Sequence, residues 1–168
     1  MPTPIETVVT TPTPTGFVFL AVDVVAYYQS IGYECDPPKR STIAAGYTLT
    51  GCSLADKAGR TRVVGIVTDA AGVLGNGYAG VWGNSNEVYL KPDDALDPLA
   101  AFLGAMLGAE RGAEAAIWMK EHLGEAYATT TSGSITIATY TGSADDTSEL
   151  YVEVANDAYL AASPPPTT

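Results

Sequence analysis

The stretch from Thr61 to Asp69 reads TRVVGIVTD and carries the clearest strand signal in the chain. It is rich in valine, isoleucine and threonine, which strands favour. The turn residues Ala70-Ala71-Gly72 follow it, and Val73 to Trp82 then runs back with strand character. These residues predict an antiparallel hairpin, around which the rest of the sheet is expected to assemble.

Other segments alternate apolar and polar residues, as strands with one buried face do. The alternation is clean from Ser134 to Thr141 (SITIATYT) and from Glu149 to Val154 (ELYVEV), and the acidic turn Gly142 to Thr147 joins the two. Three further strands are predicted, at Tyr33 to Asp36, Tyr47 to Ser53 and Glu87 to Leu90.

Three helices are predicted from residues at helical spacing. The first ends near Gly32, the second at Gly108 and the third at Gly124, because glycine is a frequent helix stop. In the second helix Asp97 is expected to be the N-cap and Pro98 the first helical residue. The predicted faces are Leu20, Val24, Tyr27, Tyr28 and Ile31 in the first helix, Leu99, Leu103, Met106 and Leu107 in the second, and Ala113, Ala116, Ile117, Lys120 and Leu123 in the third.

The expected fold class is α+β, with an antiparallel sheet of about five to six strands and three helices packed on one face. A helix followed by two strands occurs twice in this order, which suggests a duplicated unit. A chain of 168 residues with 46% hydrophobic residues is long enough to bury a real core. We expect one domain at 17–162, with disordered Thr/Pro-rich tails at 1–16 and 163–168.

The chain is strongly acidic, with 19 acidic residues against 8 basic ones and a formal charge of −11. Such a surface repels nucleic-acid phosphates and anionic lipid, so nucleic-acid binding and peripheral membrane binding are not expected. Membrane insertion of the domain itself is not expected either, because the apolar run Phe17 to Ala26 is interrupted by Asp23 and is too short to span a bilayer. Basic partners, cations and neutral ligands remain open. The charge is also explained by solubility alone.

Cys35 and Cys52 are the only cysteines, and they are predicted to form a disulfide that ties the first helix to the sheet. An isolated pair between Thr/Pro-rich tails is typical of extracytoplasmic domains, at the cell surface or secreted. No signal peptide is visible, since Met1 is followed by Pro2 and no apolar segment. The competing interpretation is an intracellular interaction protein with two free thiols.

Residues 75–80 read GNGYAG and match the glycine pattern of dinucleotide-binding loops. That pattern must open a helix, whereas VWGNSN follows here and has no helical character. A strand explains the glycines better, because small residues on one face of a strand let a helix pack closely. No cofactor is therefore expected.

The other face of the same strand carries Tyr78 and Trp82. If helices cover only one side of the sheet, these rings stand on the uncovered side. Neighbouring strands are expected to bring four more residues to that side, namely Thr48, Thr50, Tyr140 and Tyr151. Tyrosine and tryptophan supply contact area at low entropy cost, so this face could bind a protein, a peptide or a glycan. The simpler interpretation is cross-strand packing that only stiffens the sheet.

Residues suited to catalysis are scarce. His122 is the only histidine, no G-x-S-x-G nucleophile motif occurs, and no metal-ligand spacing is present. The cluster Asp93, Asp94 and Asp97 is explained by helix capping. Carboxylates are plentiful, and their pairing in space cannot be read from a sequence.

These features predict a non-enzymatic extracytoplasmic binding module, the soluble part of a secreted protein or lipoprotein, of unidentified ligand. The alternatives are a small carboxylate-based hydrolase and the intracellular protein with free thiols.

Overall fold

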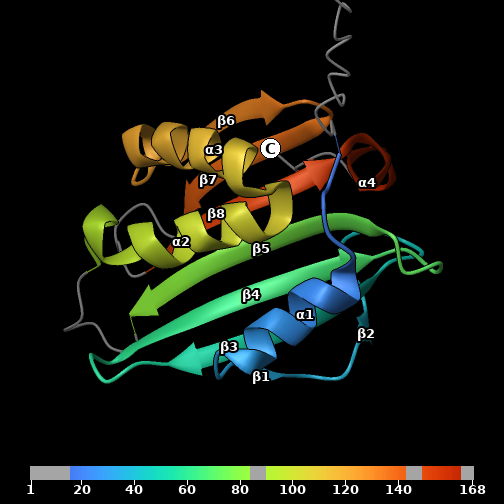
Figure 1. Cartoon of the computed structure of the whole chain (residues 1–168), viewed down its shortest axis with the longest axis horizontal. Coiled ribbons are helices and arrows are strands. Elements are labelled where there is room, and N and C mark those ends of the chain that lie inside the picture. The colour runs from blue at the N-terminus through green and yellow to red at the C-terminus, as the bar shows by residue number, and fades with distance from the viewer. Residues whose placement is uncertain (1–15, 84–89, 143–148, 164–168) are drawn as a thin grey trace, which may run out of the picture.

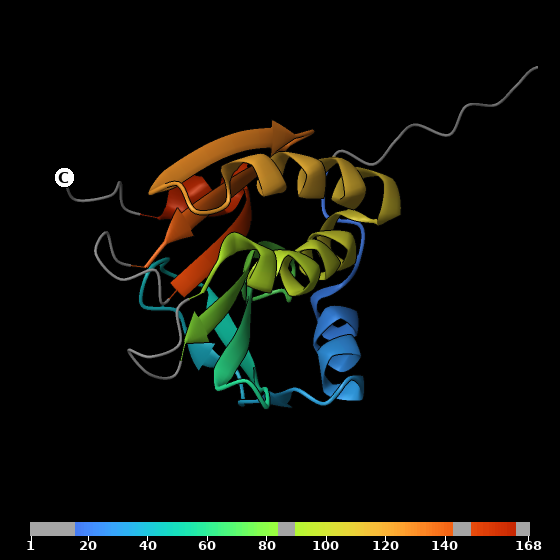
Figure 2. The ribbon, with the colours of Figure 1, turned by 90° about the vertical axis from the view of Figure 1, so that its left-hand side faces the viewer.

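The computed structural model describes residues 16–83, 90–142 and 149–163, and within them lie eight strands and four helices (Figure 1). Three helices cover one face of a single antiparallel sheet, as Figure 2 shows from the side. The elements are α1 (Ala21–Ser30), β1 (Glu34–Cys35), β2 (Lys39–Arg40), β3 (Thr48–Ala55), β4 (Arg60–Thr68), β5 (Leu74–Gly83), α2 (Pro92–Leu107), α3 (Ala109–His122), β6 (Tyr127–Ser132), β7 (Ile135–Thr141), β8 (Glu149–Asn156) and α4 (Asp157–Ala162).

The strand order is β1-β3-β4-β5-β8-β7-β6, and the two-residue β2 also pairs with β3. Two three-stranded meanders, β3 to β5 and β6 to β8, therefore meet along their last strands. A helix precedes each meander, α1 the first and α3 the second. The duplication of a helix–strand–strand unit stays a prediction, since five strands follow α1 before α2 begins and three follow α3 before α4 begins.

The α+β class and the antiparallel sheet are confirmed, and so is the central hairpin, in which Gly65 lies opposite Tyr78. The predicted count of five to six strands and three helices is too low. The elements that the sequence pattern missed are β2, β6 and α4. β2 has two residues, α4 has six, and β6 (YATTTS) is an edge strand without buried apolar residues, so none of them carries a hydrophobic period.

The core lies between the sheet and the three long helices. Leu99, Phe102, Leu103 and Met106 of α2 are fully buried against it. Gly77 has no side chain, and this lets α2 pack closely against β5, because a Cβ atom there would lie 2.6 Å from Met106 Cε. This is the close helix packing that the small residues of β5 predicted.

The α3 face was predicted wrongly. Ile117 is 67% exposed, while Ala115 and Met119 are buried. Arg111 is also buried, where its guanidinium donates hydrogen bonds to the Ser132 hydroxyl and carbonyl and to the Gly16 carbonyl. The helix is alanine-rich on several sides, so these specific contacts decide its rotation more than its hydrophobicity does.

Helix α2 begins six residues before the predicted start, with Pro92 at its first position and Pro98 inside it. Asp94, not Asp97, caps it by accepting a hydrogen bond from the Lys91 backbone N–H at 2.9 Å. Asp94 also forms an ion pair with Arg60 at 3.1 Å. The predicted start was wrong because Pro92 also suits a first helical position, and the carboxylate of Asp94 caps the backbone there.

The Cys35–Cys52 disulfide is present, and neither cysteine is free. Cys35 lies in β1 directly opposite Cys52 in β3, so the bond joins an edge strand to the sheet and not α1 to the sheet as predicted. Helix α1 is anchored by Val24 and Tyr28, whereas Leu20, Tyr27 and Ile31 are exposed.

Several predictions lie wholly or largely outside the described residues: the two tails, the strand at Glu87 to Leu90 and the turn at Gly142 to Thr147. Within the described residues, no helix is both long enough and apolar enough to cross a bilayer.

Candidate functional site

The sheet face opposite the three long helices, here called the outer face, carries a pocket of about 490 Å³. Four of the six predicted binding residues line it, namely Tyr78, Trp82, Tyr140 and Tyr151. We call it the tyrosine pocket. Its other lining residues are Ser41, Thr42, Ile43, Leu49, Val67, Asn76, Thr141, Gly142, Glu149, Glu153 and Tyr159.

Glycines on neighbouring strands seat the tyrosine rings. The Tyr78 ring lies where a Cβ of Gly65 would stand, and the Tyr151 ring lies 2.5 Å from the position of a Gly80 Cβ. Tyr140 stacks on Tyr151 with ring centroids 4.9 Å apart and planes 15° apart. The rings therefore lie along the sheet and form the floor of the pocket, an arrangement that bulkier residues at the glycine positions would block.

Trp82 stands at the rim, where 37% of it is exposed and its ring centroid lies 6.4 Å from that of Tyr151. The opposite end of the pocket is closed by a small second core of Ala44, Val67, Ala155 and Tyr159. Tyr159 comes from α4, which thus covers part of the outer face. The prediction that helices cover only one face is corrected to this extent.

Glu153 lies on β8 directly opposite Tyr78, and its Oε1 accepts a hydrogen bond from Asn76 Nδ2 at 2.5 Å. Burial raises the pKa of this carboxyl, and the hydrogen bond from Asn76 opposes the rise. Burial also raises the pKa of the Tyr78 and Tyr140 hydroxyls, and the nearby Glu153 charge adds to both shifts. Glu153 thus places a carboxyl group close to the tyrosine hydroxyls of the pocket.

Glu149 is the second carboxylate of the pocket. Its side chain lies near Gly142, and its Oε2 lies 3.4 Å from the Tyr151 hydroxyl. Four residues of extended strand separate the Cα atoms of Glu149 and Glu153 by about 13 Å. Glu153 turns toward Asn76, which lies opposite Ala155 and so away from Glu149. The two carboxylates therefore have different hydrogen-bond partners, Asn76 for Glu153 and Tyr151 for Glu149.

Replacing Glu153 with Gln is expected to stabilise the protein at neutral pH. The folded-state pKa of Glu153 is raised, so its ionised form disfavours folding, and that penalty is relieved as the pH falls through the folded-state pKa. Gln is neutral and retains the oxygen that Asn76 donates to.

Urea unfolding of both proteins between pH 8 and pH 4 checks this expectation. The variant should have the larger free energy of unfolding at pH 8, and its difference from the wild type should shrink toward pH 4. A wild-type protein that is more stable than the variant at pH 8 would contradict it, and Glu121→Gln, an exposed change on α3, controls for net charge.

The two predicted threonines, Thr48 and Thr50, are on the opposite face. In the β3–β4 register Thr50 pairs with Ile66, whereas Gly51 pairs with Gly65, which in turn faces Tyr78. Thr48 shares the side of Thr50, and its hydroxyl lies 3.1 Å from that of Thr68. The prediction that these threonines join the tyrosines is therefore wrong.

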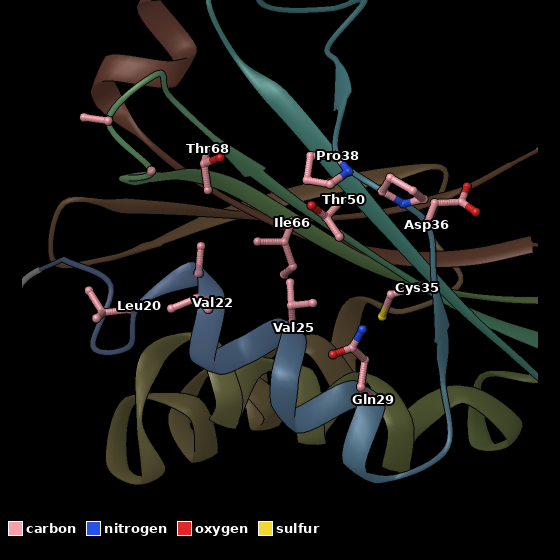
Figure 3. A pocket seen from close by; sticks show the side chains of 14 residues that line it. Leu20, Val22, Val25, Gln29, Cys35, Asp36, Pro38, Thr50, Ile66 and Thr68 are labelled. Carbon is pink, nitrogen blue, oxygen red and sulfur yellow. The ribbon is translucent and has the colours of Figure 1, made fainter.

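Thr50 instead lines a second cavity of about 750 Å³ between α1 and the strands β3 and β4, here called the α1 groove. In Figure 3 Val25 of α1 and Ile66 of β4 face each other across it. The groove is larger than the tyrosine pocket, but its walls are mainly aliphatic, and Gln29 and Asp36 lie at its far end (Figure 3).

Sequence reasoning missed Glu153, Glu149 and Tyr159 as pocket residues. Alternation along β8 could have identified the two glutamates, because residues 149 and 153 lie on the same face of the strand as the predicted Tyr151. Tyr159 belongs to α4, which no pattern indicated. Among the described residues, no group of three or more histidine, cysteine, aspartate or glutamate side chains could hold a metal ion.

Comparisons with protein-family models, curated proteins and solved structures find no match to this chain. Its function is therefore argued from the geometry of the pocket.

Proposed function

We propose that this chain is a non-enzymatic extracytoplasmic binding module that recognises a protein, a peptide or a glycan with the outer face of its sheet. The observation that carries the proposal is the tyrosine pocket, into which four predicted aromatic residues converge from β5, β7 and β8. Its volume of about 490 Å³ lies in the range of ligand pockets, and its carboxylates and hydroxyls can orient a ligand.

Two features support the extracytoplasmic location. The disulfide is compatible with an oxidising compartment, where such bonds form and persist. The acidic surface, with a charge of −11, suits a soluble module and disfavours nucleic acid as a partner.

The pocket favours binding over catalysis. Its two carboxylates have separate hydrogen-bond partners, and no histidine lines the pocket. His122 instead lies at the end of α3, where its Nδ1 is 3.0 Å from Glu125 Oε1 and its ring is tilted against that of Trp118. The hydrolase alternative gains no support from this geometry, and the disulfide gives none to a protein with free thiols.

Trp82→Ala and Tyr78→Ala are expected to weaken partner binding at least about tenfold, because buried aromatic anchors dominate interface energies. Neither change should abolish folding, since Trp82 is 37% exposed and Tyr78 is half-buried on the outer face. Screening the protein on glycan and peptide arrays and then measuring the hits by calorimetry checks this.

Ile117→Ala is the matched control, because Ile117 is 67% exposed on α3, behind the sheet. Wild-type affinity in both aromatic variants would refute the proposal for this face. Loss of cooperative unfolding in them would show that the rings are core residues.

A further inference from the structure

We propose that the tyrosine pocket binds an organic cation, the ammonium or guanidinium group of a basic ligand. This inference rests on the proposed function and names the chemical class that the site accepts. It follows from the charge of the pocket, its aromatic walls and the unusual position of Glu153.

The charge of the pocket is one-sided. Glu149 and Glu153 both line it, and no lysine, arginine or histidine does. Among the described residues neither carboxylate takes part in an ion pair, whereas Asp36, Asp56 and Asp94 elsewhere on the surface each have a basic partner. A positive ligand would supply the missing countercharge.

Aromatic rings surround the same space. Tyr140 and Tyr151 stack 4.9 Å apart, Trp82 adds an edge-on ring at the rim, and Tyr78 lies beside Glu153. The face of an aromatic ring attracts a cation, most strongly for tryptophan, and cages of several such rings select ammonium groups. A neutral sugar would use the rings but would leave the carboxylates without a charge partner.

Glu153 is costly for the fold as it stands. Glu153 is half-buried, and a carboxylate that is paired only with an amide there loses part of the hydration it would have in solution. Asn76 occupies one of its oxygens, Oε1, and leaves Oε2 available to a second donor. An N–H of an ammonium or guanidinium group would make a charge-assisted hydrogen bond there, the stronger kind.

The group can belong to a lysine or arginine side chain of a protein, or to a free amine. Trp82 and Ile43 among its lining residues are exposed, and its volume of about 490 Å³ exceeds that of one ammonium group. A side chain could therefore enter with its neighbouring peptide on the outer face, while a free amine would occupy only the interior.

The test is an NMR titration of the full chain with blocked amino acids in pairs. The cations are N-acetyl-lysine methylamide and N-acetyl-arginine methylamide, and their neutral isosteres are the norleucine and citrulline analogues. The chain has two tryptophans, so the Trp82 indole signal reports the pocket and that of Trp118 on α3 is an internal control. Propylamine represents a free amine as the ligand, and a short lysine- and arginine-rich peptide represents a basic side chain of a protein.

The expected result is a saturable shift of the Trp82 indole signal with the cations, a much smaller one with the isosteres, and none at Trp118. Glu153→Gln should weaken cation binding by at least about tenfold, because a charge-assisted contact is lost while the fold is retained. Glu121→Gln, which removes the same charge from the exposed side of α3, should leave binding unchanged.

A basic peptide that binds far more tightly than propylamine would assign the cation to a protein side chain, and equal affinities would assign it to a free amine. Equal shifts with cations and isosteres, or unchanged cation affinity in Glu153→Gln, would overturn the cation inference. Array hits that depend on Trp82 but bear no positive charge would overturn it too, while the proposed function would stand. Absence of both cation shifts and array hits would count against both.

Discussion

Replacing both cysteines, as Cys35→Ser with Cys52→Ser, is expected to lower the free energy of unfolding by about 3 kcal/mol. The bond joins residues 17 apart, and closing a loop of that length removes roughly this much conformational entropy from the unfolded chain. The loss also has a local consequence. β1 has two residues and pairs only with β3, so without the bond the edge of the sheet beside α1 is held by few contacts.

Urea unfolding of the wild-type and doubly substituted proteins measures the effect. The control is reductant, which should destabilise the wild type by a similar amount and leave the double variant unchanged. Thiols are counted beforehand under denaturing, non-reducing conditions, with an intact mass. Two free thiols in wild-type protein that has been exposed to oxidant would contradict the disulfide and reopen the intracellular alternative.

The central hairpin was predictable because its first strand is rich in β-branched residues and a short glycine-containing turn joins it to a second long strand. The position of the tyrosines followed from the same strand, since residues 78, 80 and 82 must share a face. Tyr140 and Tyr151 could be added because β7 and β8 alternate cleanly and lie opposite each other. This part of the pocket rests on local periodicity, which a single sequence contains.

The error at Thr48 and Thr50 has a different origin. The sequence correctly separated these threonines from Tyr47 and Leu49, but it could not say which set faces the long helices. A shift of one residue in register exchanges the two sets. In the structure Tyr47 and Leu49 pack beside Tyr159 on the outer face, so the contact that settles the question comes from α4. That contact is non-local, and no pattern near β3 contains it.

The place of Glu153 in the pocket could not be predicted from the sequence for a similar reason. Along β8 it occupies a place that alternation assigns to the exposed side, where a glutamate is ordinary. In the structure it is half-buried beside Tyr78, and this neighbour depends on pairing across the sheet. A charged residue in an alternating strand can therefore indicate a site only after the register is known.

Gly112→Ala is expected to destabilise the protein by roughly 2 kcal/mol, the cost of forcing atoms into a packed contact. A Cβ at Gly112 would lie 2.6 Å from Gly104 Cα and 2.8 Å from Gly104 N, so the clash is with the backbone of α2 and no rotamer change can relieve it. The helices α2 and α3 are joined only by Gly108, whose φ of 85° turns the chain back. They have little freedom to separate.

Gly104 supplies the matched control, because a side chain is blocked at Gly112 but not at Gly104. A Cβ at Gly104 would meet nothing within 4 Å, and Gly104 lies inside α2, where alanine is favoured over glycine. Gly104→Ala should therefore stabilise the protein by about 0.5–1 kcal/mol. Thermal and urea unfolding of both variants should move the midpoints in opposite directions. Parallel changes would show that helix propensity, and not the close approach of α2 and α3, governs these positions. The expected divergence would show that the close approach of Gly112 to α2 helps to fix the position of α3, a contact that the alanine-rich sequence of α3 does not reveal.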